Sequence, residues 1–141
     1  MKTKVADVLS MKKPGRALSF IRTYSSLTEV LTDHALASLG DAYVNLIYSL
    51  ALSNKRGRPS GTKVKGSLLA EGLRRAGLRP YVPSSVSNHV LADSAEALIV
   101  YAWLHGCVAM NEAVAILEKS DDLAEGFSEL LKTIMNRIKL S

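Results

Sequence analysis

Three carboxylates lie within segments that otherwise have the character of buried apolar helix. Asp41 belongs to the segment 36–42, and Asp93 and Glu96 belong to the segment 91–99. A carboxylate among apolar neighbours is costly unless it is paired, hydrogen-bonded or bound to a cation. The placement of the three acids therefore suggests a metal site.

The spacing of the acids would allow them to share one cation. Asp93 and Glu96 are three residues apart, so on a helix their side chains emerge on nearly the same face, one turn apart. Asp41 must approach from another helix. Small residues would let the two backbones come close at the crossing, namely Gly40, Ala42, Ala92 and Ala95. Oxygen ligands suit Mg²⁺ or Mn²⁺, which keep several waters and take further ligands from substrate phosphates.

Helices must position these acids. Apolar residues recur at steps of three and four over residues 26–53, which predicts one or two long helices that include Asp41. A later helix, capped by Ser84 or Ser85 and running toward Leu104, would carry the other two acids. The same periodicity predicts further helices over 67–76, 110–118 and 123–138. Because no segment has convincing strand alternation, the sequence indicates an all-α fold.

The composition indicates one folded domain. A chain of 141 residues is long enough for one core and short for two domains. Its 48% of hydrophobic and 22% of charged residues are typical of a globular protein. We divide the chain into a basic N-terminal segment, 1–25, and a helical domain, 26–141. The sequence leaves open whether residues 1–25 pack on the core.

Neither a membrane span nor a secretory signal is predicted. The weakly charged stretch 97–113 is interrupted by polar residues and is shorter than the ~20 apolar residues that a span requires. The N-terminus carries Asp7 and Lys12 where a signal would need an apolar core. Cys107 is the single cysteine, so an internal disulfide is excluded. We expect a cytoplasmic protein with no membrane partner.

The net charge of +5 is unevenly distributed along the chain. Residues 1–22 hold six basic residues and one acid, and residues 54–80 hold eight basic residues and one acid. Within the second block, the stretch 55–66 contains three glycines and Pro59, which predicts an exposed basic loop. Such a loop attracts polyanions, and double-stranded RNA is bound through its shape and phosphates. The candidate RNA-binding residues are Lys55, Arg56, Arg58, Lys63, Lys65, Arg74 and Arg75.

Two motifs resemble the signatures of the ribonuclease III catalytic domain. The first is Leu39-Gly40-Asp41 followed by small and apolar residues. The second reads Leu91-Ala92-Asp93, then two residues, then Glu96-Ala97-Leu98-Ile99. Their order and separation fit that family, and the similarity runs from about residue 34 to residue 106. In size the chain is similar to small archaeal ribonuclease III-like proteins that have no separate RNA-binding domain.

The resemblance implies a fold, an activity and a partner. The fold would be a single all-α ribonuclease III-like endonuclease domain of about six or seven helices. The activity would be hydrolysis of double-stranded or structured RNA in RNA processing, with Mg²⁺ or Mn²⁺ as cofactor and a homodimer as the active assembly. By the same resemblance, Asp41 and Glu96 are catalytic, and Asp41, Asp93 and Glu96 are the metal ligands.

Three positions depart from the family pattern. Ala37 stands four residues before the first aspartate, where the family usually has a second metal-binding glutamate, and His34 stands where it usually has another glutamate. Ser38 replaces an aromatic residue that commonly contributes to the dimer contact. His34, and His89 one helical turn before the second motif, are candidate accessory residues.

Two other interpretations stay open. Ala37 and the basic loop also fit a catalytically inactive relative that binds RNA or associates with the ribosome. The acidic and apolar C-terminal helices also fit a helical dimer whose partner is another protein. Metal-dependent cutting separates the enzyme from the inactive relative, and salt-sensitive RNA affinity separates both from the third interpretation.

Overall fold

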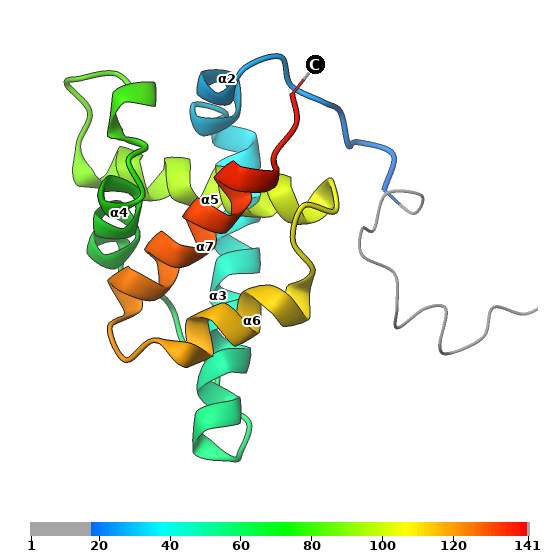
Figure 1. Cartoon of the computed structure of the whole chain (residues 1–141), viewed down its shortest axis with the longest axis vertical. Helices are drawn as coiled ribbons and strands as arrows, with labels where there is room; N and C mark the ends of the chain where they lie inside the picture. Colours follow the sequence, from blue (N-terminus) through cyan, green and yellow to red (C-terminus); the bar gives the residue numbers. More distant parts are fainter. Residues whose placement is uncertain (1–17, 141) are drawn as a thin grey trace, which may run out of the picture.

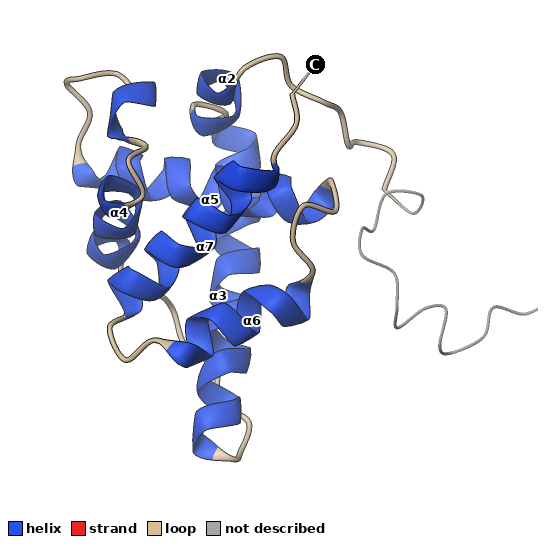
Figure 2. Ribbon diagram, viewed as in Figure 1, coloured by secondary structure: helices blue, strands red, loops and turns tan. Residues whose placement is uncertain are grey.

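The computed structural model describes residues 18–140, and these residues are helical without a strand (Figure 2). Expectations for residues 1–17 and 141 lie outside the described part of the chain. The elements in order are α2 (Leu27–Leu31), α3 (His34–Arg56), α4 (Gly66–Arg75), the short 3-10 helix η2 (Arg79–Tyr81), α5 (Asn88–Leu104), α6 (Met110–Lys119) and α7 (Leu123–Arg137). The predicted all-α fold is confirmed.

The interval 26–53 divides into two helices because side chains cap each of them separately. The Ser26 hydroxyl accepts a hydrogen bond from the Glu29 N–H and caps α2. The Asp33 carboxylate accepts from the Leu36 N–H at 3.0 Å and caps α3. Helix α3 then continues to Arg56, three residues beyond the predicted end, and Gly57 terminates it with a φ of 70°.

Helix α5 begins later than predicted. Its N-cap is Ser87, whose hydroxyl accepts from the Val90 N–H, so the assignment of Ser84 or Ser85 as the cap was wrong. The late start of α5 is explained by Arg79, whose guanidinium donates to the carbonyls of Val82, Pro83 and Ser84. These bonds hold the segment as a loop and keep its carbonyls out of a helix.

Helix α5 is the central element of the fold (Figure 1). It packs against α2, α3, α4 and α7, and almost every side chain from Leu91 to Leu104 is buried. The long helix α3 crosses it, and the C-terminal end of α3 extends beyond the other helices (Figure 1). Across this contact the rings of Tyr43 and Trp103 stack with centroids 4.6 Å apart. Part of the N-terminal segment also reaches the core, because Tyr24 is buried and its N–H donates to the Tyr101 hydroxyl.

The crossing of α3 and α5 depends on Gly40. A Cβ at this position would lie 2.1 Å from the carbonyl oxygen of Glu96. Ala92 and Ala95 are buried on the other helix, as expected for a close contact. Ala42 was expected at this crossing, but it is exposed on the opposite face of α3. A single glycine therefore accounts for the closest backbone approach.

Helix α3 is long and apolar enough to cross a membrane, judged by length and composition alone. Core helices of proteins in water pass the same test. Here α3 packs against α5 and α6, and Val44 and Ile47 are fully buried between them. We describe α3 as a core helix, and the absence of a membrane span stays a prediction.

Replacing Gly40 by alanine is expected to destabilise the fold by at least about 3 kcal/mol, because the methyl group overlaps a backbone carbonyl that cannot rotate away. Urea unfolding measures the loss. Gly61→Ala is the matched control, since no atom lies within 4 Å of a Cβ built there. Equal stability of the two variants would contradict the proposed close contact.

Candidate active site

The three acids face one cavity of about 400 Å³ between α3, α5 and the start of α4. Asp41 comes from α3, and Asp93 and Glu96 come from α5. The complete lining consists of His34, Ala37, Ser38, Asp41, Val64, Gly66, Leu69, His89, Ala92, Asp93 and Glu96. The fold therefore brings together two segments that are about fifty residues apart in the sequence.

Glu96 is the most buried of these acids, with 7% of its surface exposed. The pKa of Glu96 is raised to about 8, first by burial and then by a hydrogen bond with Asp41 and the negative charges of Asp41 and Asp93. The nearby charge of Lys63 acts in the opposite direction. At neutral pH the Glu96 carboxyl therefore keeps its proton and donates it in a hydrogen bond to Asp41.

Asn45 supports Asp41 from one helical turn further along α3. Its amide nitrogen donates to Asp41 Oδ1 at 3.0 Å, and its amide oxygen accepts from the Val64 N–H at 2.8 Å. Asn45 lies four residues after Asp41, so the two side chains share one face of α3. Its second bond, to the basic loop, has no local signal in the sequence, because 19 residues separate Asn45 from Val64.

The two histidines lie at the rim of the cavity. His34 is the first residue of α3 and is exposed. His89 Nε2 lies 3.7 Å from Asp93 Oδ2, and the imidazole is 85% exposed. Both therefore have access to solvent and neither is a buried structural histidine.

Ala37 lies on the cavity wall one helical turn before Asp41, and it is 6% exposed. This is the position where a glutamate was expected from the resemblance. The same alanine lines a neighbouring apolar cavity of about 320 Å³, bounded by residues such as Leu31, Pro83 and Val90. The two cavities are therefore neighbours that share His34, Ala37 and Asp93 in their linings.

The comparison with protein families decides the identity of the fold. The family model of ribonuclease III matches residues 34–140. The chain belongs to the ribonuclease III family. The match begins at the first residue of α3 and includes both acidic motifs. No curated protein matches the chain. Membership in the ribonuclease III family points to RNA as the substrate class.

Members of the ribonuclease III family generally use a divalent metal ion. Within residues 18–140, no three His, Cys, Asp or Glu side chains stand where they could together hold one. The donors are nevertheless of the right chemical type, because carboxylate oxygens are preferred by Mg²⁺ and Mn²⁺. The proton that Glu96 donates to Asp41 reduces the repulsion between the two carboxyl groups, and a bound cation would do the same in its place. Holding an ion would require this proton to leave and the side chains to converge.

The basic loop of this ribonuclease III domain borders the acidic cavity. Val64 and Gly66 belong to the cavity wall, and Lys63 is near enough to Glu96 to act on its pKa. Arg58, Lys63 and Lys65 are exposed, and within residues 18–140 their side chains form no ion pair or hydrogen bond. Lys55 and Arg56 belong to the last turn of α3, where Lys55 donates to the Ser120 carbonyl and Arg56 to the Ser60 hydroxyl.

Arg74 and Arg75 are placed differently from the other basic candidates. They lie at the C-terminal end of α4, about 13 Å along the helix from Gly66. Arg75 forms ion pairs with Glu71, Asp122 and Glu125, at distances from 2.9 to 3.4 Å. Arg74 pairs with Glu71 and donates to Asn88. These contacts tie α4 to α7 and to α5, so the two guanidinium groups have structural partners.

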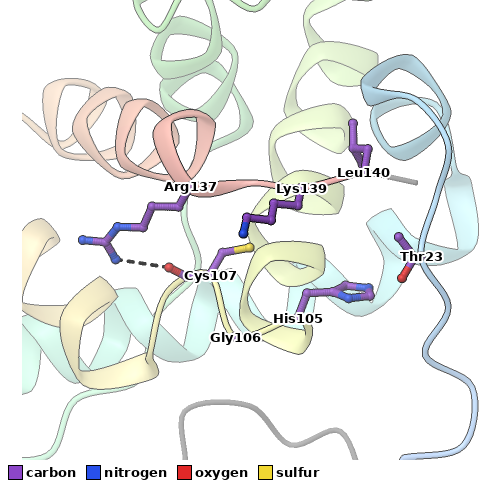
Figure 3. Close-up of a pocket in the computed structure, with 7 residues that line it drawn as sticks. All are labelled: Thr23, His105, Gly106, Cys107, Arg137, Lys139 and Leu140. Atoms are coloured by element: carbon purple, nitrogen blue, oxygen red, sulfur yellow. Dashed lines mark hydrogen bonds between the residues drawn. The ribbon is translucent and has the colours of Figure 1, made fainter.

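A second cavity, of about 440 Å³, lies at the far end of α5 (Figure 3). Its lining includes His105, Cys107, Arg137 and Lys139. Arg137 donates to the Cys107 carbonyl at 3.1 Å and forms a two-point ion pair with Glu112. Burial raises the pKa of the Cys107 thiol, which keeps it protonated and unreactive. No acid lines this cavity among the described residues, and the contacts of Arg137 hold the end of α7 against α6 and the segment after α5.

The raised pKa of Glu96 predicts a pH-dependent cost in stability. In the unfolded chain Glu96 ionises near 4.5, and in the fold it ionises near pH 8. The stabilisation that comes from the protonated Glu96 carboxyl is therefore complete below about pH 4.5. It is lost as the pH rises through about 8. Glu96→Gln cannot ionise, so its stability relative to the unaltered protein should increase over this interval, by on the order of a few kcal/mol.

Urea unfolding at pH 5 and pH 8.5, in a metal chelator, measures this difference. Glu129→Gln, an exposed position on α7, is the control and should show the same pH profile as the unaltered protein. A Glu96→Gln profile that is parallel to the unaltered one would contradict the protonated state of Glu96.

Proposed function

We propose that this chain is a metal-dependent endoribonuclease that hydrolyses phosphodiester bonds of double-stranded RNA, in cytoplasmic RNA processing. The observation that carries the proposal is the acidic cavity, which Asp41, Asp93 and Glu96 line from two helices beside the basic loop. Membership in the ribonuclease III family supports the same conclusion.

In the proposed reaction, Asp41, Asp93 and Glu96 would hold Mg²⁺ or Mn²⁺. When bound, the metal would polarise the scissile phosphate and activate a water for in-line attack. The chain itself positions Asp41 through the Asn45 amide, at 3.0 Å. It also places Glu96 where burial keeps the carboxyl protonated until cation binding releases the proton to solvent or to a base. Asp41 and Glu96 are the proposed catalytic residues.

The basic loop is the proposed contact with the RNA backbone. Arg58, Lys63 and Lys65 are exposed, and their side chains form no ion pair or hydrogen bond in the described part of the chain. Aromatic residues make up only 6% of the chain, which favours recognition of phosphates and duplex shape over base stacking. Lys55 and Arg56 extend this surface at the end of α3. Arg74 and Arg75 contribute mainly to the packing of α4.

A homodimer is proposed for the active assembly. One face of α3 exposes a stripe of apolar side chains, Leu39, Leu46 and Leu50, which are 38 to 45% exposed. Ala42 and Ser38 lie on the same exposed face. An apolar stripe along a core helix is costly in water, and a second copy of the chain would cover it. Because Asp41 is on this helix, the dimer would place two acidic cavities near one another.

An inactive RNA-binding relative is the second candidate. It is favoured by Ala37, which replaces an expected ligand on the cavity wall, and by side chains that do not converge on a cation site within the described residues. It shares the basic loop and the family fold with the enzyme. It differs in predicting RNA binding with no metal-dependent cutting.

Cleavage of a labelled RNA duplex in Mg²⁺ or Mn²⁺ tests the proposed function. We expect duplex-specific cutting by the unaltered chain, with no cutting of single-stranded RNA or duplex DNA. Asp41→Ala and Glu96→Ala should abolish cutting, because each removes a carboxylate from the cavity. Both variants should retain salt-sensitive RNA binding.

Thermal unfolding verifies that these variants fold, and Glu129→Ala serves as an exposed acidic control on α7. Undiminished cutting by Asp41→Ala and Glu96→Ala would overturn the site. Tight RNA binding by the unaltered chain with no cutting in either metal would favour the inactive relative.

Leu46→Glu is expected to convert the dimer to a monomer, because a charge at the centre of the apolar stripe cannot be buried against a second copy. Sedimentation velocity measures the change in mass. Tyr81→Glu is the control, since Tyr81 is equally exposed, at 46%, but lies on η2 away from the stripe. A monomeric unaltered chain would exclude this dimer.

A further inference from the structure

A regular set of hydrogen bonds joins the basic loop to α3. Ser53 Oγ accepts from the Ser60 N–H at 2.9 Å, and its own hydrogen is within reach of two carbonyls, that of Ser49 at 2.7 Å and that of Ser60 at 3.1 Å. Ser49 Oγ accepts from the Thr62 N–H and donates to the Thr62 carbonyl, at 3.0 Å for both bonds. Asn45 Oδ1 accepts from the Val64 N–H at 2.8 Å. We call Asn45, Ser49 and Ser53, with their three loop partners, the loop ladder.

The ladder is regular because two repeats match in length. Its helix residues are four apart, which is about 6 Å of rise along α3. Its loop residues are two apart, which is about 6.6 Å of extended chain. The loop therefore runs antiparallel to α3 for three successive steps, and in each step a side-chain oxygen of α3 accepts a hydrogen bond from a loop N–H. A segment that its composition predicted only as an exposed loop has a fixed register on the helix.

The ladder ends at the acidic cavity. Asn45 forms the last step, and its amide nitrogen donates to Asp41 Oδ1 at 3.0 Å. Asp41, Asn45, Ser49 and Ser53 thus form one stripe of α3 at intervals of four residues. Val64, the last loop partner, is half-buried on the cavity wall. One side chain therefore contacts both an acid of the cavity and the backbone of the basic loop.

The lysines of the loop alternate with the residues that the ladder holds. Lys63 and Lys65 flank Val64 and are exposed, whereas Val64 packs against the core. Lys63 is also near enough to Glu96 for its charge to act on that carboxyl. Fixing the register of Val64 therefore fixes where the backbone of Lys63 and Lys65 lies relative to the acids.

We propose that Asn45 is a positioning residue that couples RNA-phosphate binding by Lys63 to the acid Asp41, with Ser49 and Ser53 holding the loop in register. This inference rests on the proposed function and deepens it. In this arrangement Lys63 makes the contact nearest the scissile phosphate. The site also depends on Asn45, a neutral side chain that does not itself touch the substrate.

Two measurements separate the roles of the ladder residues. The first is the affinity for a fluorescent RNA duplex in a metal chelator, by anisotropy at several salt concentrations. The second is the single-turnover cleavage rate at saturating RNA. The variants are Asn45→Ala, Ser49→Ala and Lys63→Ala, with the double variants of Lys63→Ala. Asn54→Ala is the matched control, because Asn54 is on the same helix but donates to Glu118 on α6.

Ser49→Ala should weaken duplex binding by about three- to tenfold, the effect of a lost hydrogen bond, and leave the saturated cleavage rate unchanged. Asn45→Ala should weaken binding to a similar degree and also slow cleavage, since Asp41 loses its donor. Adding Asn45→Ala to Lys63→Ala should not weaken binding beyond Lys63→Ala alone. Such non-additivity is expected when one residue acts through another.

Three results would overturn the inference. One is duplex affinity unchanged in Asn45→Ala and Ser49→Ala, and another is fully additive losses with Lys63→Ala. The third is an equal loss in Asn54→Ala, which would indicate general destabilisation of α3. These results are distinct from failure of the proposed function, which would appear as no duplex binding or cutting by the unaltered chain and would remove this inference with it.

Discussion

The close backbone contact between Gly40 and Glu96 is the constraint on which the site depends. A side chain at position 40 would overlap the Glu96 carbonyl, so only glycine permits α3 and α5 to cross at this distance. The next residue on α3 is Asp41, and the partner at the crossing is the acid itself. The crossing therefore brings the carboxylates together as a direct result of backbone packing. The raised pKa of Glu96 follows from its burial at this crossing and from the proximity of Asp41 and Asp93.

The site combines two opposite charge requirements within a small space. Acids crowded on the α3 and α5 faces need compensation, and the bases of the loop need to stay available to an anion. The loop ladder satisfies both requirements with neutral side chains, because Asn45, Ser49 and Ser53 hold the loop without neutralising Lys63 or Lys65. Elsewhere the chain uses charge for packing, as Arg75 does between α4 and α7.

Local signals were sufficient to predict the helices, and they failed where a distant side chain competed. The ranges for α4, α6 and α7 agree closely with the prediction, since periodicity and terminal residues are local. The start of α5 was wrong because Arg79 binds the carbonyls before it. Ala42 was misplaced because composition does not tell which face of α3 meets α5. The grouping of Asp41 with Asp93 and Glu96 came from motif resemblance, whereas the approach of Lys63 depends on a loop register that no local pattern encodes.

The stacked rings of Tyr43 and Trp103 allow the packing of α3 on α5 to be followed by fluorescence. Trp103 is the only tryptophan of the chain, and its ring is stacked on Tyr43 from the opposite side of the α3–α5 contact. The two rings are nearly parallel, with 18° between their planes. The indole emission of the protein therefore comes from Trp103 alone. Its stacking partner, Tyr43, lies three residues after Gly40 on α3. Any event that shifts α3 against α5 changes the surroundings of a single fluorophore, without a label being attached.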